Sequence, residues 1–153
     1  MNRILWEEQL TPIEADYARW CDEQGALLRS GKLDAIDREN LAEEIESLGR
    51  SERREIESRL NILLLHLLKW KFQSEKRKSG WKGSILEARR QLRRILAESP
   101  SLKNYPAQIL REEYEIARLK AADETGLGED NFPQECPFTM DDIFDETFLP
   151  ADI

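Results

Sequence analysis

The chain of 153 residues is poor in side chains that bind metals or form disulfides. It contains one histidine, His66, and two cysteines, Cys21 and Cys136, which lie far apart without a CxxC pattern. This composition predicts neither a zinc site nor a redox motif, because one histidine alone makes a poor transition-metal site. A glycine-rich phosphate loop, a repeat and a low-complexity run are also absent. We therefore expect no cofactor and no metal, we assign no catalytic residue, and we consider an enzyme less favoured than a non-catalytic protein.

Long hydrophobic runs are also lacking. The first ten residues, MNRILWEEQL, do not contain the apolar stretch of a signal peptide. The longest apolar stretch, residues 60–72, is too short and too charged at its flanks to span a bilayer. We predict a cytoplasmic protein that has no membrane contact, and the sparse cysteines fit a reducing compartment.

The remaining composition is typical of a globular helical protein. Charged residues make up 35% and hydrophobic residues 40% of the chain. The apolar positions recur at steps of three and four residues, which is the period of an amphipathic helix. The length suits one domain, or one domain with an appendage, and is enough to bury a hydrophobic core.

Charge is distributed unevenly along the chain, whose net charge is −8. Residues 1–68 contain 9 basic and 15 acidic side chains, residues 69–94 contain 10 and 2, and residues 95–153 contain 4 and 14. The three segments therefore carry net charges of −6, +8 and −10. The overall charge disfavours a general nucleic-acid binder. The basic middle segment could pair with the acidic ends of the same chain, or it could be a docking face.

Helix signals predict an all-α, four-helix bundle-like domain over residues 1–125. A first helix begins after the N-cap Thr11 and ends at Gly31. One long central helix over 40–72 is favoured over two, since Gly49 inside it costs only about 1 kcal/mol. Leu41, Ile45 and Leu48 are assigned to the apolar stripe of this helix, which continues through Ile56 to Leu68. The third and fourth helices are expected over 81–98 and 105–125, separated by a stop at Ser99 and Pro100 and connected to the second by a loop over 73–80.

Residues 126–153 differ from the rest of the chain because they are acidic and punctuated by proline. Thr139 and Asp142 form a capping pair that predicts one short helix. The scattered phenylalanines indicate an ordered extension that packs on the bundle through its aromatic rings.

The segment Leu60–Phe72 is apolar on every helical face. A surface helix needs only one apolar stripe, so this helix must be covered from at least two sides. Either neighbouring helices or a partner chain could supply that cover. If one small bundle does not suffice, Leu60–Leu68 would be a surface for self-association.

Several motifs together resemble the bacterial domain-of-unknown-function family 29, and the resemblance extends from Tyr17 to Pro150. They are ENLAEEIESLGRSERREIESRL at 39–60, LLLHLLKW at 63–70, SGWKGSILEARRQL at 79–92, ESPSL at 98–102 and FPQECPFTMDDIFDETFLP at 132–150. This family is abundant in cyanobacteria, is all-helical and has no established activity. The resemblance implies a helical fold and a bacterial source, and it carries over no catalytic residue.

His66 is a candidate general base or metal ligand. Its neighbours three and four residues away supply no carboxylate, so Glu43 or Glu46 would have to reach it in space. The ExxH pattern of carboxylate-bridged bundles is absent. A structural histidine is the favoured interpretation, and the acidic side chains near the start of the long helix are explained by its dipole.

Basic residues interleaved with Trp70 and Trp81 form a second candidate site, because such surfaces can bind phosphates or stacked bases. The tryptophans fit the apolar stripes better and are expected to anchor the core. The candidate binding residues are Lys76, Arg77, Arg89, Arg90, Arg93 and Arg94. The last four of these are predicted to lie on the polar face of the helix over 81–98.

Three functions remain open. The favoured one is a protein-interaction or regulatory module that binds another protein or itself without catalysis. The first alternative is a nucleic-acid or phosphate binder that acts through residues 69–94. The second is a metal or acid/base site around His66 with Glu43 or Glu46.

Overall fold

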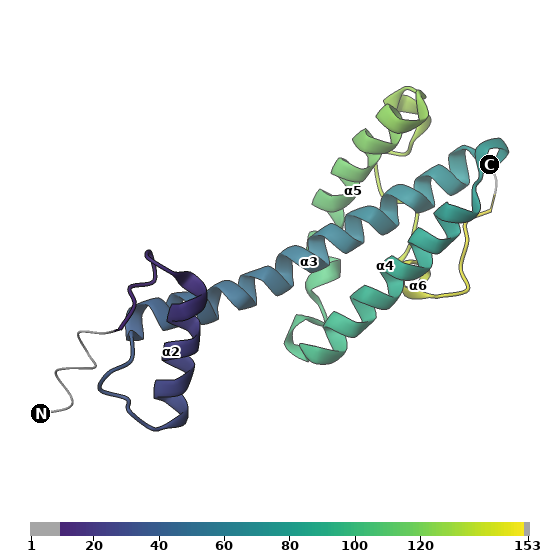
Figure 1. Ribbon diagram of the computed structural model, residues 1–153. Coiled ribbons are helices and arrows are strands. Elements are labelled where there is room, and N and C mark those ends of the chain that lie inside the picture. The colour runs from purple at the N-terminus through teal and green to yellow at the C-terminus, as the bar shows by residue number, and fades with distance from the viewer. Residues whose placement is uncertain (1–9, 152–153) are drawn as a thin grey trace, which may run out of the picture. The chain divides into compact units, whose positions relative to one another are not determined.

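A computed structural model describes residues 10–151, and within them it contains five α-helices, three short 3-10 helices and no strand (Figure 1). This confirms the all-α prediction. The α-helices are α2 (Tyr17–Arg29), α3 (Arg38–Phe72), α4 (Ser79–Glu98), α5 (Tyr105–Thr125) and α6 (Met140–Phe144), and the 3-10 helices are η1 (Ser74–Lys76), η2 (Pro100–Leu102) and η3 (Glu129–Asn131). The chain divides into two compact units, residues 1–50 and residues 51–153. No described helix is long and apolar enough to cross a membrane.

In the N-terminal unit, helix α2 begins later than the sequence pattern predicts. Residues around Pro12 form a turn closed by a hydrogen bond from Ala15 N–H to the Pro12 carbonyl, and the helix starts at Tyr17. The predicted N-cap Thr11 is therefore wrong. Asp16 is the N-cap instead, because its carboxylate accepts from the Arg19 backbone N–H at 3.1 Å.

The core of the N-terminal unit is small. Trp20, Gln24 and Leu27 are the buried residues of α2. The Trp20 indole donates to Asp37 Oδ2 at 3.0 Å, and Gln24 Oε1 accepts from the Asp37 N–H at 2.7 Å. Asp37, which precedes α3, therefore fastens the start of that helix to α2. Hydrogen bonds to its carboxylate from the side chain of Asn40 and from Trp20 lower the pKa of Asp37.

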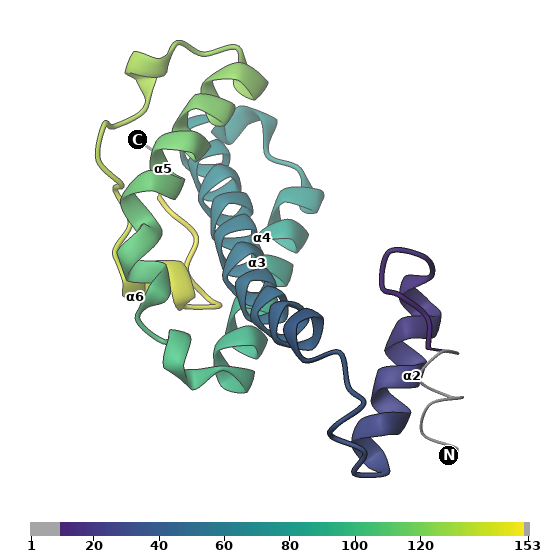
Figure 2. The same cartoon turned by 90° about the vertical axis from the view of Figure 1, so that its left-hand side faces the viewer.

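Helix α3 runs without interruption through Gly49, as the sequence predicts. Its last half carries eight buried residues between Ile56 and Leu68 and lies between α4 and α5, on opposite sides of it in Figures 1 and 2. These two helices, together with residues 126–149, cover the segment that is apolar on every face. The loop predicted over 73–80 is shorter than expected, since α4 begins at Ser79.

The other helix ends follow the sequence signals. Helix α4 stops before Pro100, α5 carries a proline in its first turn, and Gly126 ends α5 in the left-handed conformation with φ 72°. Thr139 and Asp142 form the predicted capping box of α6, in which each side chain accepts from the other's backbone N–H.

Residues 126–151 complete the core of the second unit. Phe132, Phe138 and Ile143 are buried in it, and Phe144 and Phe148 pack against it. The Tyr114 hydroxyl of α5 donates to the Pro133 carbonyl at 2.6 Å. The aromatic anchoring of this segment is confirmed, whereas the division into domains at residue 125 stays a prediction.

Candidate functional site

Arg89, predicted to lie on the polar face of α4, is buried, with 1% of its surface exposed. That placement is wrong. Its guanidinium donates from Nε to the Ile143 carbonyl at 2.8 Å, from Nη1 to the Phe148 carbonyl at 2.8 Å, and from Nη2 to the Asp142 carbonyl at 3.0 Å. Burial lowers the pKa of Arg89, and the charges of Asp145 and Glu146 oppose that shift. Each of its three nitrogens donates to the backbone of α6 or of the residues that follow it, and a ligand would have to displace that backbone.

Arg90 and Arg93 are exposed on the predicted face but pair with the acidic tail. Glu146 Oε1 lies 3.0 Å from Arg93 Nη1 and 3.7 Å from Arg90 Nε. Arg93 also donates to the Phe144 carbonyl at 2.8 Å. Part of the basic middle segment is therefore neutralised by the tail of the same chain.

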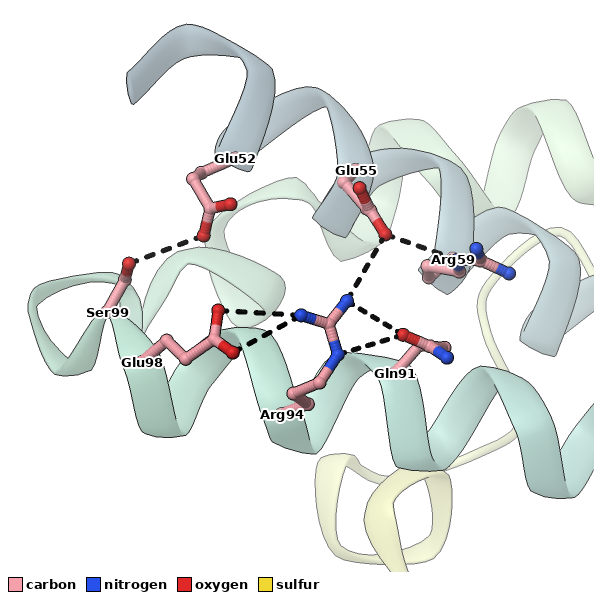
Figure 3. A network of polar contacts seen from close by, with 7 residues as sticks. All are labelled: Glu52, Glu55, Arg59, Gln91, Arg94, Glu98 and Ser99. Carbon is pink, nitrogen blue, oxygen red and sulfur yellow. Dashed lines mark hydrogen bonds and ion pairs between the residues drawn. The ribbon is translucent and has the colours of Figure 1, made fainter. Parts of the chain in front are cut away.

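Arg94 lies at the centre of a polar network between α3 and α4 (Figure 3). Its guanidinium donates to Gln91 Oε1 at 2.8 and 3.1 Å and to Glu98 at 3.3 Å, and it lies 3.8 Å from Glu55 Oε1. About half of the Arg94 side chain remains exposed. Exposed pairs of this kind contribute little stability, about 0 to 1 kcal/mol each, but they compete with an anionic ligand for the guanidinium.

The remaining basic candidates lie between α3 and α4. Arg77 donates from Nε to the Trp70 carbonyl at 2.9 Å and stacks 4.6 Å from the centre of the Trp70 ring. The Lys76 side chain is exposed in η1. Trp81 is buried, as expected for a core anchor, and Trp70 is half-buried beneath Arg77. A role of these residues in binding stays a prediction.

His66 makes its polar contact within its own helix. Its Nδ1 lies 2.8 Å from the Ile62 carbonyl, and the ring is half-buried. Glu43 and Glu46 belong to the N-terminal unit, whereas His66 belongs to the other unit. Among residues 10–151 there is no group of three histidine, cysteine or acidic side chains that could hold a metal ion. The hypothesis of a functional His66 gains no support from these contacts.

Two grooves run along α5, and the sequence patterns indicated neither. One, of about 660 Å³, is lined by α5 side chains and by residues 134–136. Burial raises the pKa of the Cys136 thiol at its edge, which disfavours the reactive thiolate. The other, of about 460 Å³, contains buried Asn61, whose amide donates to Glu113 Oε2 at 3.2 Å and whose oxygen accepts from Lys120. Asn61 is a polar residue in an apolar run, and this exception could have indicated the groove.

The buried polar groups near these grooves form their hydrogen bonds within the chain. Among the described residues, no buried side-chain nitrogen or oxygen lacks a hydrogen-bond partner. Burial raises the pKa of Glu113, and the hydrogen bond from Asn61 opposes the shift. Among the described residues, therefore, neither groove contains a buried polar side chain that lacks a hydrogen-bond partner and needs a ligand to supply one.

The six leucines of the segment Leu60–Leu68 are buried by this chain, whereas Ile62 and His66 are half-buried. The sequence-based reason for self-association through that segment is therefore removed. Exposed apolar side chains occur elsewhere, mainly in the N-terminal unit. They include Tyr17, Leu28, Leu33, Ile45 and Leu48, whereas the larger second unit contributes Ile116 and Leu119.

The most exposed of these residues cluster on one side of α3. Ile45 and Leu48 have 66% and 69% of their surface exposed, and Leu41, one turn before Ile45, is partly exposed. We call the surface formed by Leu41, Ala42, Ile45, Leu48 and Gly49 the α3 apolar face. The sequence pattern assigned Leu41, Ile45 and Leu48 to the stripe that continues into the core. For Ile45 and Leu48 that assignment is wrong, since the described chain leaves them uncovered.

Comparison with known proteins identifies a family but no characterised relative. Neither the curated proteins nor the solved structures include a significant match to this chain. The model of one family, described as Domain of unknown function DUF29, matches residues 13–149. This range covers most of the chain and includes helices of both units. The protein therefore belongs to the DUF29 family.

Proposed function

We propose that this protein is a non-catalytic protein-interaction module whose binding surface is the α3 apolar face. The observation that carries the proposal is the exposure of Ile45 and Leu48, two large aliphatic side chains one turn apart on a well-formed helix. Contiguous exposed apolar patches on a protein surface mark sites of interaction. Covering one such side chain contributes roughly 1.5 to 3 kcal/mol.

The mode of binding that this surface favours is helix against helix. Leu41, Ile45 and Leu48 follow the spacing of four and three residues that forms the seam of a helix pair. A partner helix laid along α3 would cover all three side chains together. No rearrangement of the core of the second unit is needed for this contact.

The basic segment supports its alternative function less well. Arg89 is buried, and Arg90, Arg93 and Arg94 each face a carboxylate of this chain. A nucleic acid would have to displace Glu146 and Glu98 before it gained these contacts. If this alternative is correct, Arg90→Glu combined with Arg94→Glu abolishes nucleic-acid binding without loss of thermal stability.

Photo-crosslinking in the cells that naturally produce the protein tests the proposal. A photoreactive amino acid is placed at the position of Ile45 in one variant and at exposed Glu87 of α4 in a matched control. We expect a discrete crosslinked polypeptide from position 45, identified by mass spectrometry, and none of the same identity from position 87. Equal or absent crosslinking at the two positions contradicts the proposal.

A further inference from the structure

We propose that the occupant of the α3 apolar face is a second copy of this chain, with the two α3 helices packed antiparallel around a two-fold axis at Ile45. This inference rests on the proposed function and names its partner. It follows from the self-complementarity of the face, a property that a binding site for an unrelated helix would not need.

The residues concerned all lie on one side of the helix. Successive residues of an α-helix are rotated by 100°, so Leu41, Ala42, Leu48 and Gly49 all fall within about 60° of Ile45 around the axis. Arg38 and Glu52 fall within about 20° of the same direction, near the two ends of the face. All belong to the single helix α3.

A two-fold axis at Ile45 places large residues opposite small ones. It pairs each residue with the one equally far from position 45 on the other side, so Leu41 meets Gly49 of the second copy and Leu48 meets Ala42. Ile45 meets its own counterpart. A symmetric interface needs one surface that complements itself, and small residues let the two helix backbones approach closely.

The charges at the ends of the face obey the same symmetry. Arg38 of one copy lies opposite Glu52 of the other, seven residues on either side of Ile45, so the interface contains this pair twice. The Arg38 side chain is exposed. The described contact of Glu52 is a weak one, in which Oε2 accepts from the Ser99 hydroxyl at 3.4 Å (Figure 3). The parallel arrangement would bring like residues together and would lose this complementarity.

No contact among the described residues of one copy explains why position 49 is a glycine. Glycine in a helix interior weakens the helix, and a Cβ built on Gly49 would have no neighbouring atom within 4 Å. Packing inside the chain therefore does not require a glycine at this position. The close approach of Leu41 from a second copy does require a glycine there.

Sedimentation velocity of the whole chain at micromolar concentrations and low salt tests the proposal. We expect a monomer–dimer equilibrium. Arg38→Glu and Glu52→Arg should each weaken the dimer about tenfold, because each places two pairs of like charges in contact. The double variant, Arg38→Glu with Glu52→Arg, restores opposite charges and should recover most of the wild-type affinity. Failure of this recovery overturns the antiparallel pairing.

A glycine pair separates an interface effect from a folding effect. Gly49 and Gly83 both lie inside helices, and a Cβ at either would meet no atom of the chain within 4 Å. Only Gly49 lies on the proposed interface. Gly49→Leu should weaken the dimer about tenfold or more through overpacking against Leu41, whereas Gly83→Leu should leave it unchanged. Circular dichroism confirms that both variants remain folded.

The outcomes distinguish this inference from the broader function. A wild-type chain that stays monomeric over the whole concentration range overturns the inference. If position 45 then crosslinks to a different, identified protein, the proposed function as an interaction module holds, and that protein is the partner. If position 45 also fails to crosslink, both proposals are wrong.

Discussion

A single buried cation organises the C-terminal part of this protein. The three carbonyls that Arg89 binds belong to residues that follow it by 53 to 59 positions, so one side chain holds both α6 and the backbone that follows it. A guanidinium suits this task because its donors point in several fixed directions within one plane. Lysine could not reproduce that geometry.

Replacing Arg89 should therefore be far more damaging than replacing its neighbour. Arg89→Ala leaves three carbonyls without their donor, and we expect a loss of about 3 kcal/mol in the free energy of unfolding. Arg90→Ala removes an exposed pair and should change it by less than about 0.5 kcal/mol. Urea denaturation of both variants measures the difference. Equal effects would show that the contacts of Arg89 contribute no more than a surface pair.

Tyr114 predicts an alkaline loss of stability. Burial raises the pKa of Tyr114 from its ordinary value of 10.0 to about 12, so the unfolded chain releases this proton at lower pH than the folded chain. The pKa shift of Tyr114 contributes roughly 2 to 3 kcal/mol to the free energy of unfolding. This contribution is fully present below pH 10 and is lost as the pH rises toward about 12. Comparison of denaturation curves across this range with those of Tyr114→Phe checks the assignment, since the variant should lose less stability there.

The position of Arg89 was predictable, but its partners were not. It follows Ile85 by four residues and precedes Leu92 by three, which places it on the buried stripe of α4. Residue type argued for the polar face and proved misleading. The carbonyls that satisfy its charge come from a distant segment, and helical periodicity contains no information on such contacts.

At the scale of elements, local chemistry located most helix ends. Pro106, Gly126 and the Thr139–Asp142 pair act through neighbouring backbone groups, and each marks the boundary it predicts. Thr11 failed because two capping residues stand close together and Asp16 takes the role. The candidate α3 apolar face was missed for another reason. Its residues have the same spacing as core residues, and spacing does not reveal whether the chain provides a cover.

Gly49 and Gly126 should respond oppositely to substitution by alanine. Gly49→Ala meets open space in a regular helix and should stabilise the chain by up to about 1 kcal/mol. Gly126→Ala forces a side chain into the left-handed conformation at φ 72° and should destabilise it by about 1 kcal/mol. Thermal denaturation at a concentration where the chain is monomeric measures both. Destabilisation by Gly49→Ala would indicate a contact that the structure does not contain.

For the whole molecule, the sequence predicts the helical class, the long central helix and the ordered acidic segment. The division into a small and a large unit was not predicted, because α3 continues through the boundary at residue 50 as one helix. The N-terminal unit buries Trp20, Gln24 and Leu27 of α2, whereas the second unit contains an extensive apolar core. The N-terminal unit should therefore be less stable than the second unit.

Hydrogen exchange should therefore reveal two levels of protection. Amides of α2 are expected to exchange at a free energy well below that of global unfolding, whereas amides of α4 and of α3 between Ile56 and Leu68 should exchange only with global unfolding. Mass spectrometry of peptides from the intact chain resolves these segments. Uniform protection of α2 and α4 would mean that the chain opens as one cooperative unit.

The contacts of Arg89 also impose an order on events during synthesis. A nascent chain that has been synthesised only as far as α5 already contains the arginine, but the carbonyls of residues 142, 143 and 148 have not yet been made. Phe132, Phe138 and Ile143, which close the core, are missing at the same stage. Translation must therefore pass α6 before the second unit can reach its native state. Until then its leucine-rich helix is a candidate client for chaperones.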